Sequence, residues 1–138
     1  MQYSKGDYFV LQGSFTTTSY IVLQGSDVIV IRSQLLKGFL DGCILAVIEE
    51  RTVYGYELSQ RLNEIGLIDV SEGTIYPVLL RLQKNHYIVG EMKPSPSGPS
   101  RKYYVLTDEG HEALQLIREE WQKIQAPIAK LLGGTTNE

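Results

Sequence analysis

The sequence predicts a mainly α-helical fold that carries one small β-hairpin. From residue 32 onward, apolar residues recur at intervals of three and four in three successive segments, the spacing of a helix with one buried face. Between residues 88 and 106, apolar and polar residues instead alternate on either side of a segment rich in proline and serine, as in two strands joined by a turn. A final long segment returns to the helical spacing.

Length and composition limit what the chain can be. It has 138 residues, of which 43% are hydrophobic and 21% charged, values typical of one globular domain. The longest apolar runs, such as Cys43–Ile48, fall far short of the ~20 residues that span a bilayer. One cysteine and two histidines exclude an intrachain disulfide and a cysteine-based zinc site. We therefore expect a cytoplasmic protein without a metal, a cofactor or a membrane segment.

The residue patterns of common enzymes are missing from the sequence. It contains no Ser-His-Asp arrangement and no paired catalytic carboxylates, and no glycine is followed by lysine as a phosphate-binding loop requires. The remaining glycines are too isolated for a dinucleotide-binding fingerprint. We therefore expect no enzyme activity.

Residues 1–31 differ in composition from the rest of the chain. They contain three tyrosines, a run of three threonines and two copies of the segment Val-Leu-Gln-Gly-Ser, too few copies for a repeat fold. Two interpretations stay open. One is a disordered or non-native extension, which would follow if translation naturally starts near Val28 or Val30. The other is an ordered arm with strands around Phe9–Leu11 and Tyr20–Leu23.

The first helix is predicted to begin after Ser33, whose hydroxyl suits an N-cap, and to continue through Ile48. Its apolar stripe begins at Leu36. Gly38 and Gly42 interrupt this segment, and each weakens a helix by about 1 kcal/mol relative to alanine. Glycines at these positions suggest that another backbone comes close, or that the helix prediction is imperfect.

The second helix is predicted over Tyr56–Asn63, and the third begins at the N-cap Ser71. Pro77 conflicts with that start, because a proline in the second turn removes one hydrogen bond and costs about 3 kcal/mol. The conflict eases if the regular helix starts near Thr74 or if the Gly73 carbonyl has another partner. The side chains predicted to face inward are Tyr54, Leu58 and Leu62 for the second helix, and Ile75, Val78, Leu79 and Leu82 for the third.

A β-hairpin and a long helix follow. The two strands are predicted over Ile88–Lys93 and Lys102–Leu106, with a long, stiff loop at Pro94–Ser100 between them. The last helix is predicted to begin at the N-cap Thr107. Pro127 should kink or end this helix, because proline cannot donate a backbone hydrogen bond.

Three short helices followed by a hairpin form the order of a winged helix-turn-helix domain. In that arrangement the third helix enters the major groove of DNA and the hairpin contacts the flanking backbone. Residues 72–102 carry five basic and two acidic side chains, although the whole chain has a net charge of −3. This local surplus on two elements is what a DNA-binding surface needs. The predicted organisation is an extension (1–31), a winged helix-turn-helix domain (32–106), a C-terminal helix (107–132) and a tail (133–138).

Seven residues of the third helix and the hairpin are candidates for DNA contact. Hydroxyl, phenol and cationic groups reach phosphates, and arginine also reads guanine. Simpler interpretations exist: Tyr76 could pack in the core, Arg81 could lie on a solvated face, and Lys84 could favour the helix dipole. Because side chains alternate along a strand, only one of Arg101 and Lys102 is expected to face DNA. The candidates are Thr74, Tyr76, Arg81, Lys84, Lys93, Arg101 and Lys102, whereas the neighbouring Tyr103 and Tyr104 are predicted to pack.

Three segments resemble the PadR family of transcriptional regulators. The middle one is the most specific, because a proline directly after tyrosine is rare inside a recognition helix. The resemblance covers residues 33–132, and the single C-terminal helix with Trp121 midway is similar to the short branch of the family that includes multidrug-sensing repressors. The three segments are Val53–Leu58, Gly73–Leu82 and Arg101–Gly110.

The resemblance implies a homodimer, joined mainly by the last helix with help from the first, that represses nearby genes until a small, often aromatic molecule binds. It also implies that Trp121 lines a pocket at the dimer interface and stacks on flat ligands; the alternative is that Trp121 only packs the dimer core. The predicted function is a ligand-responsive repressor of operator DNA. Two alternatives stay open: a winged-helix protein-interaction module that has lost DNA binding, and a small-molecule carrier.

Overall fold

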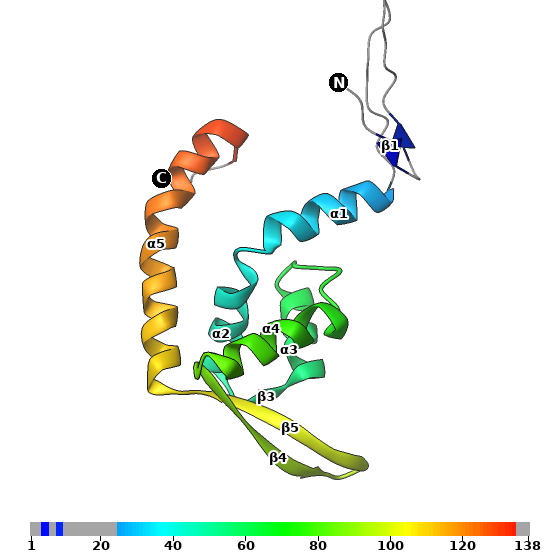
Figure 1. Cartoon of the computed structure of the whole chain (residues 1–138), viewed down its shortest axis with the longest axis vertical. Coiled ribbons are helices and arrows are strands. Elements are labelled where there is room, and N and C mark those ends of the chain that lie inside the picture. The colour runs from blue at the N-terminus through cyan, green and yellow to red at the C-terminus, as the bar shows by residue number, and fades with distance from the viewer. Residues whose placement is uncertain (1–3, 6–7, 10–24, 135–138) are drawn as a thin grey trace, which may run out of the picture. The chain divides into compact units, whose positions relative to one another are not determined.

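The chain divides into two compact units, Met1–Phe39 and Leu40–Glu138, of which the computed structural model describes residues 4–5, 8–9 and 25–134 (Figure 1). In the first unit, β1 (Ser4–Lys5) pairs with β2 (Tyr8–Phe9) in antiparallel fashion, and α1 spans Gly25–Leu36. The strand predicted at residues 20–23 lies outside the described residues. Both interpretations of residues 1–31 therefore stay predictions.

The prediction of a first helix capped by Ser33 is wrong. Ser33 lies inside α1, and a second helix, α2, begins at Leu40 and ends at Glu50. Between them, the N–H groups of Lys37 and Phe39 donate to carbonyls only three residues earlier, which replaces the α-helical pattern by a tight turn. Gly38 lies in this turn, where its low helix propensity favours the break.

The three helices α2, α3 (Gly55–Glu64) and α4 (Glu72–Lys84) build the core of the second unit. The inward faces predicted for α3 and α4 are confirmed except at Tyr54, which lies in a strand. Among the described residues, no helix combines the length and the apolar character needed to cross a membrane. The buried side chains of the core include Ile44, Leu45, Leu58, Leu62, Ile75, Leu79, Leu82, Ile88 and Leu114.

The N-cap prediction for α4 is confirmed. The Ser71 hydroxyl accepts a hydrogen bond from the Thr74 N–H at 3.3 Å, and the helix begins at Glu72 rather than at Thr74. Pro77 therefore lies inside the helix. Its missing N–H removes the donor that the Gly73 carbonyl would use, but both residues are exposed, so water can reach that carbonyl.

A three-stranded antiparallel sheet follows the order β3-β5-β4. β4 (Ile88–Ser95) and β5 (Gly98–Leu106) form the predicted hairpin, and β3 (Val53–Tyr54) pairs with the inner end of β5. Figure 1 shows the hairpin projecting from the helices beside α4. β3 was not predicted, because two residues are too few to display a strand period.

The long, stiff loop predicted at residues 94–100 is wrong. The strands continue until Ser95 pairs with Gly98, so only Pro96 and Ser97 form the turn. Pro94 is tolerated in β4 because β4 is an edge strand of the sheet. The register also shifts between Lys93 and Ser95, so the ladder is irregular at this proline.

α5 (Asp108–Leu132) is the predicted long helix, and its cap is the predicted one. The Thr107 hydroxyl accepts from the Gly110 N–H at 2.9 Å and donates to the His86 carbonyl at 2.6 Å. The Thr107 side chain therefore connects the start of α5 to His86, which lies just after the end of α4. The helix continues past Pro127, so this proline does not end it.

The first half of α5 packs against α2. Gly42 leaves room for this contact, because a Cβ atom built there would lie 2.7 Å from Cγ2 of Ile117. The neighbour that excludes a side chain at Gly42 is thus another side chain rather than the backbone that we expected. Two turns farther along α2, Glu49 accepts a hydrogen bond from the Arg118 guanidinium at 3.0 Å, and this hydrogen bond lowers the pKa of the Glu49 carboxyl.

Candidate nucleic-acid interface

The outer face of α4 carries four of the residues predicted to contact DNA. Thr74, Arg81 and Lys84 are exposed, and the side chain of Tyr76 is 58% exposed, so Tyr76 does not pack in the core. Thr74 and Arg81 are seven residues apart and therefore share one side of the helix, whereas Tyr76 points to the other side. α4 thus presents these groups to both of its flanks.

Arg81 is held on the flank that faces α2. One of its guanidinium nitrogens donates to a carboxylate oxygen of Asp41. The side chains are 50% and 31% exposed, and ion pairs of such exposure contribute only about 0.2–1 kcal/mol. This pair therefore orients the guanidinium more than it stabilises the fold. Because Asp41 and Arg81 are forty positions apart, no pattern in the sequence indicated this ion pair.

The two neighbouring cations of β5 point to opposite faces of the sheet, as the strand period predicts. Lys102 turns toward α4, where its ammonium donates to the Gln83 side chain at 3.3 Å and lies 5.9 Å from the centre of the Tyr104 ring. Arg101 turns the other way, and its Cζ lies 4.5 Å from the centre of the Tyr54 ring. The hairpin thus offers cations on both faces.

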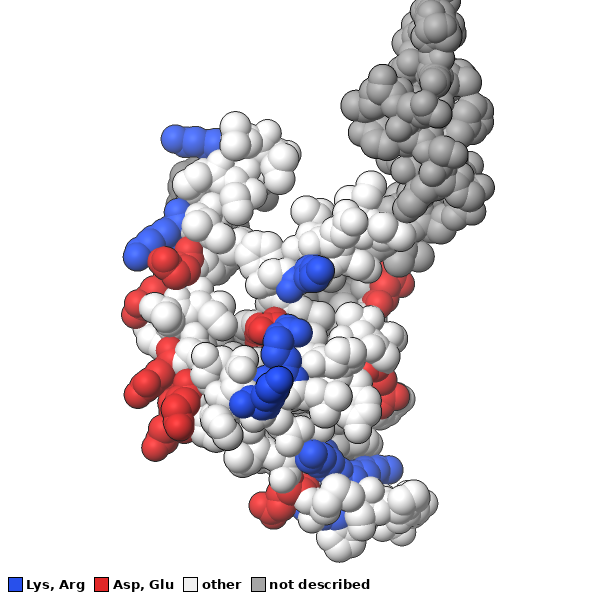
Figure 2. Space-filling view, in the orientation of Figure 1, with Lys and Arg blue, Asp and Glu red and all other residues white. Residues whose placement is uncertain are grey.

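Most of the cations on α4 and the hairpin have no carboxylate partner among the described residues. Figure 2 shows basic side chains over these two elements, whereas acidic side chains gather along α5. Arg81 pairs with Asp41. Within the described residues, no carboxylate oxygen lies within 4.0 Å of Lys84, Lys93, Arg101 or Lys102.

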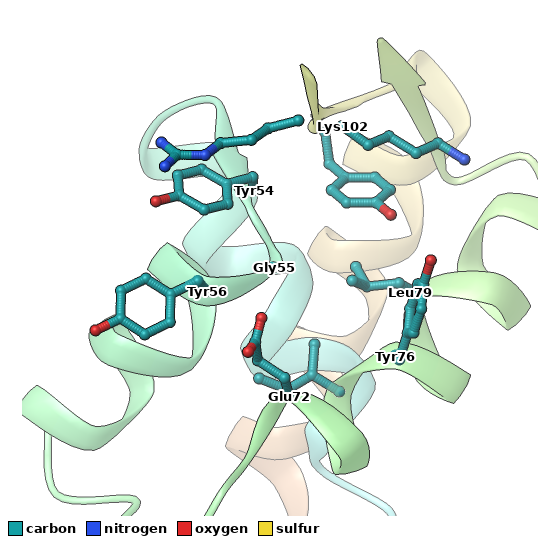
Figure 3. A pocket seen from close by; sticks show the side chains of 10 residues that line it. Tyr54, Gly55, Tyr56, Glu72, Tyr76, Leu79 and Lys102 are labelled. Atoms are coloured by element: carbon teal, nitrogen blue, oxygen red, sulfur yellow. The ribbon is translucent and has the colours of Figure 1, made fainter. Parts of the chain in front are cut away.

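A cleft of about 280 Å³ lies between the hairpin and the beginnings of α3 and α4. Figure 3 shows Glu72 and Tyr76 of α4 facing Tyr54 and Tyr56 across it. The cleft is aromatic and polar, and Tyr104 forms part of its wall. Burial, aided by the nearby Tyr76, raises the pKa of the Tyr104 phenol, which therefore stays protonated and can donate a hydrogen bond.

We also looked in the described part of the chain for a metal site and for a reactive cysteine. No three His, Cys, Asp or Glu side chains there lie close enough together to hold a metal ion. Cys43 is half-buried in α2, and burial raises the pKa of its thiol. A raised pKa keeps the thiol protonated and unreactive, which agrees with a packing role.

Along α5, an apolar stripe that begins at the contact with α2 stays partly accessible. It repeats at intervals of three and four, and Trp121 lies in its middle. Large accessible apolar patches mark interfaces in soluble proteins. The exposed fractions are 36% for Ile117, 40% for Trp121, 43% for Ile124 and 39% for Ile128.

Sequence reasoning missed two contributors to this surface. Tyr54 was predicted to face the core, but it lies at the junction of β3 and α3 and is half-buried under Arg101. Asp41 was not singled out, although it determines where the Arg81 guanidinium points. Both contacts join residues far apart in sequence, so no local pattern could have revealed them.

Comparison with known proteins gives consistent results. The chain matches the model of the PadR-like family of transcriptional regulators over residues 44–116. It is similar to a PadR-like transcriptional regulator from Bacillus cereus, with 50% identity, 75% of this chain and 100% of that chain covered, and a TM-score of 0.66. A Streptococcus transcriptional regulator has 46% identity, coverage of 71% and 96%, and a TM-score of 0.63. A Lysinibacillus sphaericus protein, named as uncharacterized, is 33% identical over 106 residues, which are 75% of this chain and 97% of that protein.

These matches agree with the architecture. The family model begins within α2 and ends in the first turns of α5, so it covers α3, α4 and the hairpin completely. The predicted fold class and the predicted family resemblance are therefore confirmed. The chain belongs to the PadR-like family of transcriptional regulators, and it is a DNA-binding transcription regulator.

Proposed function

We propose that this regulator is a homodimeric repressor that binds operator DNA through α4 and the β4–β5 hairpin and is released by a small effector. One observation carries the proposal. On a chain with a net charge of −3, these two elements hold five basic side chains, four of them without a carboxylate partner among the described residues. Cations without carboxylate partners, concentrated on two neighbouring elements, are suited to the phosphates of DNA.

The proposed contacts of α4 follow from its exposed face. Thr74, Tyr76 and Lys84 present a hydroxyl, a phenol and an ammonium, which reach phosphate oxygens. Arg81 is proposed to read a base, because arginine pairs with both acceptors of guanine in the major groove. To contact a base, Arg81 has to break its ion pair with Asp41. The free-energy cost of breaking this pair is small, because both side chains are partly exposed to solvent.

On the hairpin, Arg101 and Lys93 are the proposed phosphate contacts. The Lys102 ammonium already donates to Gln83 of α4, so a DNA contact there has to compete with this hydrogen bond. Arg101 has no such hydrogen bond among the described residues and lies over a tyrosine ring instead. Of the two neighbouring cations, Arg101 is therefore the proposed DNA contact.

Dimerisation is proposed to use the apolar stripe of α5. Side chains that are about two-fifths exposed in one chain become buried when a second α5 packs against them. A two-fold dimer would place the two α4 helices for half-sites about one helical turn of DNA apart. The α5–α2 contact at Gly42 and Glu49 then transmits any change in the dimer interface to the DNA-binding elements.

Release by an effector is proposed as a shift between two dimer arrangements. A flat aromatic molecule that stacks on Trp121 would favour an arrangement in which the spacing of the α4 helices no longer matches the operator. A tenfold difference in effector affinity between the two arrangements corresponds to about 1.4 kcal/mol, so a modest preference suffices.

Binding to the DNA immediately upstream of the protein's own gene should be tight and strongly salt-dependent. For six to ten phosphate contacts, affinity falls by about 10³–10⁵-fold between 50 and 200 mM salt. Fluorescence anisotropy at a series of salt concentrations, with scrambled DNA of equal length as control, measures this dependence. Absence of binding at low salt by a folded dimer would contradict the proposal and favour the protein-interaction module or the carrier.

Trp121→Ala should abolish the binding of flat aromatic dyes and leave the dimer intact, because the substitution removes the stacking ring but only one of four stripe residues. Dye fluorescence titrations and light scattering measure the two properties. Ile128→Ala is the matched control, since Ile128 is equally exposed on the same stripe. Full dye binding by Trp121→Ala would show that the ligand site lies elsewhere.

A further inference from the structure

Two tyrosine rings lie next to each other on the outward face of the three-stranded sheet. Tyr54 of β3 is the register partner of Tyr103 of β5, and their ring centres are 5.3 Å apart in an edge-on arrangement. The next pair in the register, Val53 and Tyr104, is buried. Because successive side chains of a strand point to opposite faces, Tyr54 and Tyr103 face away from the core.

Each of these rings lies beneath a cation of the hairpin. The Cζ atom of Arg101 is 4.5 Å from the centre of the Tyr54 ring, and the Nζ atom of Lys93 is 5.3 Å from the centre of the Tyr103 ring. Both distances fall within the ~6 Å over which a ring face attracts a cation. Arg101 and Lys93 are also opposite each other in the register. We call these four side chains the wing-base cluster.

The wing-base cluster places two like charges next to each other. Like charges directly opposite each other on a sheet repel, and the register places Arg101 opposite Lys93. Glu91, the acidic residue opposite Tyr103, forms no ion pair with either cation within the described residues. The arrangement therefore leaves two positive charges close together, which an approaching phosphate would neutralise.

The backbone of Tyr54 is held by two neighbouring elements. Tyr54 is paired with β5 and is also the N-cap of α3, where its N–H donates to the Glu57 carboxylate at 3.3 Å. Long cationic side chains lose rotamer freedom when they bind a phosphate, and this loss weakens binding. A cation that already rests on a fixed ring loses less freedom and binds more tightly.

We infer that Tyr54 and Tyr103 are positioning residues for DNA binding, which hold Arg101 and Lys93 ready for the phosphates of the DNA backbone. The inference rests on the proposed function, because it requires the hairpin to contact DNA. Figure 3 shows the Tyr54 ring at the edge of the cleft, on the side opposite Glu72. The inference assigns Tyr103 more than the packing role expected from the sequence.

The test compares leucine and phenylalanine at each tyrosine in the full-length protein, by anisotropy with the upstream DNA fragment at several salt concentrations. Tyr54→Leu and Tyr103→Leu should each weaken binding about fivefold, the scale of an exposed cation–ring contact. The dependence on salt should be unchanged, because the cations remain. Tyr54→Phe and Tyr103→Phe keep the ring and should bind within about twofold of the wild type.

Two outcomes of this comparison would overturn the inference. Leucine variants that bind as tightly as the wild type would show that the rings do not assist the cations. Phenylalanine variants that lose as much as the leucine variants would show that the phenol oxygen acts, rather than the ring.

A double-mutant cycle separates positioning from a merely structural role. Arg101→Ala should weaken binding and reduce the salt slope by about 0.9 for each lost phosphate contact. Added to Arg101→Ala, Tyr54→Leu should cost less than about twofold, because the ring then has no cation to position. A fivefold loss in both backgrounds would assign Tyr54 a structural role and overturn the inference.

Circular dichroism of every variant checks the fold. Should Tyr54→Leu not fold, the Tyr103 variants with Lys93→Ala decide the question, because Tyr103 begins no helix. Failure of the proposed function looks different from failure of the inference. In the first case the wild type shows no salt-dependent DNA binding; in the second the wild type binds and only the difference between leucine and phenylalanine variants disappears.

Discussion

Gly110→Ala is expected to lower the melting temperature by about 8 °C. Gly110 lies in the first turn of α5, where a Cβ atom would collide with the backbone carbonyl of Tyr87. Overpacking against a backbone that cannot move aside costs about 3 kcal/mol, and the better helix propensity of alanine returns at most about 1 kcal/mol. The net loss of about 2 kcal/mol corresponds to this shift at roughly 4 °C per kcal/mol for a chain of this size.

Gly73→Ala is the matched control for this prediction. Gly73 also lies in the first turn of a helix, but a Cβ atom there would meet only the Ser71 hydroxyl, at an ordinary 3.6 Å. Its melting temperature should therefore stay equal or rise by a few degrees. Scanning calorimetry at one fixed protein concentration compares the two variants. A Gly110→Ala variant as stable as Gly73→Ala would contradict the close approach of α5 to Tyr87.

Ile124→Asp is expected to separate the proposed dimer and to weaken operator binding by more than 100-fold. Ile124 lies in the apolar stripe of α5, next to Trp121 in the repeat. An unpaired charge buried in an interface costs about 3–5 kcal/mol, and a two-fold dimer buries two of them. The dissociation constant of the dimer should rise at least 1000-fold, since each tenfold corresponds to about 1.4 kcal/mol. Sedimentation velocity over a range of concentrations measures it.

Gln122→Asp provides the control, because it introduces the same charge on the same helix at an exposed position away from the stripe. It should leave the dimer and the DNA affinity nearly unchanged. A dimer that survives Ile124→Asp with wild-type affinity would place the interface on another surface. Loss of the dimer in both variants would point to a general effect of negative charge on α5.

Much of the fold could be predicted from the sequence because its signals are local. Ser71 and Thr107 are the caps that their hydroxyls suggested, since an N-cap needs only the N–H groups two or three residues later. Ile75, Leu79 and Leu82 are buried as predicted, because the helical period alone decides which residues share a face.

The errors occur where neighbouring segments decide between local alternatives. The helical spacing of apolar residues continues on both sides of Gly38 in the sequence, yet the chain turns there and α2 begins at Leu40. The prolines of residues 94–100 suggest a loop in the sequence, but β4 and β5 stay paired as far as Ser95 and Gly98, next to the turn of the hairpin. Pairing across the hairpin outweighs the weak strand propensity of each segment.

Spacing, composition and charge in the sequence predicted the winged helix-turn-helix order and the basic stretch that contacts DNA in the proposed function, and the resemblance of three segments indicated the family. The tertiary structure alone decided how individual groups are oriented: Arg81 against Asp41, Arg101 over Tyr54, and Gly110 beneath the Tyr87 carbonyl. The physical reason is the distance along the sequence over which each interaction acts. Periodicity and capping act over a few residues, whereas these contacts join segments that only the folded chain brings together.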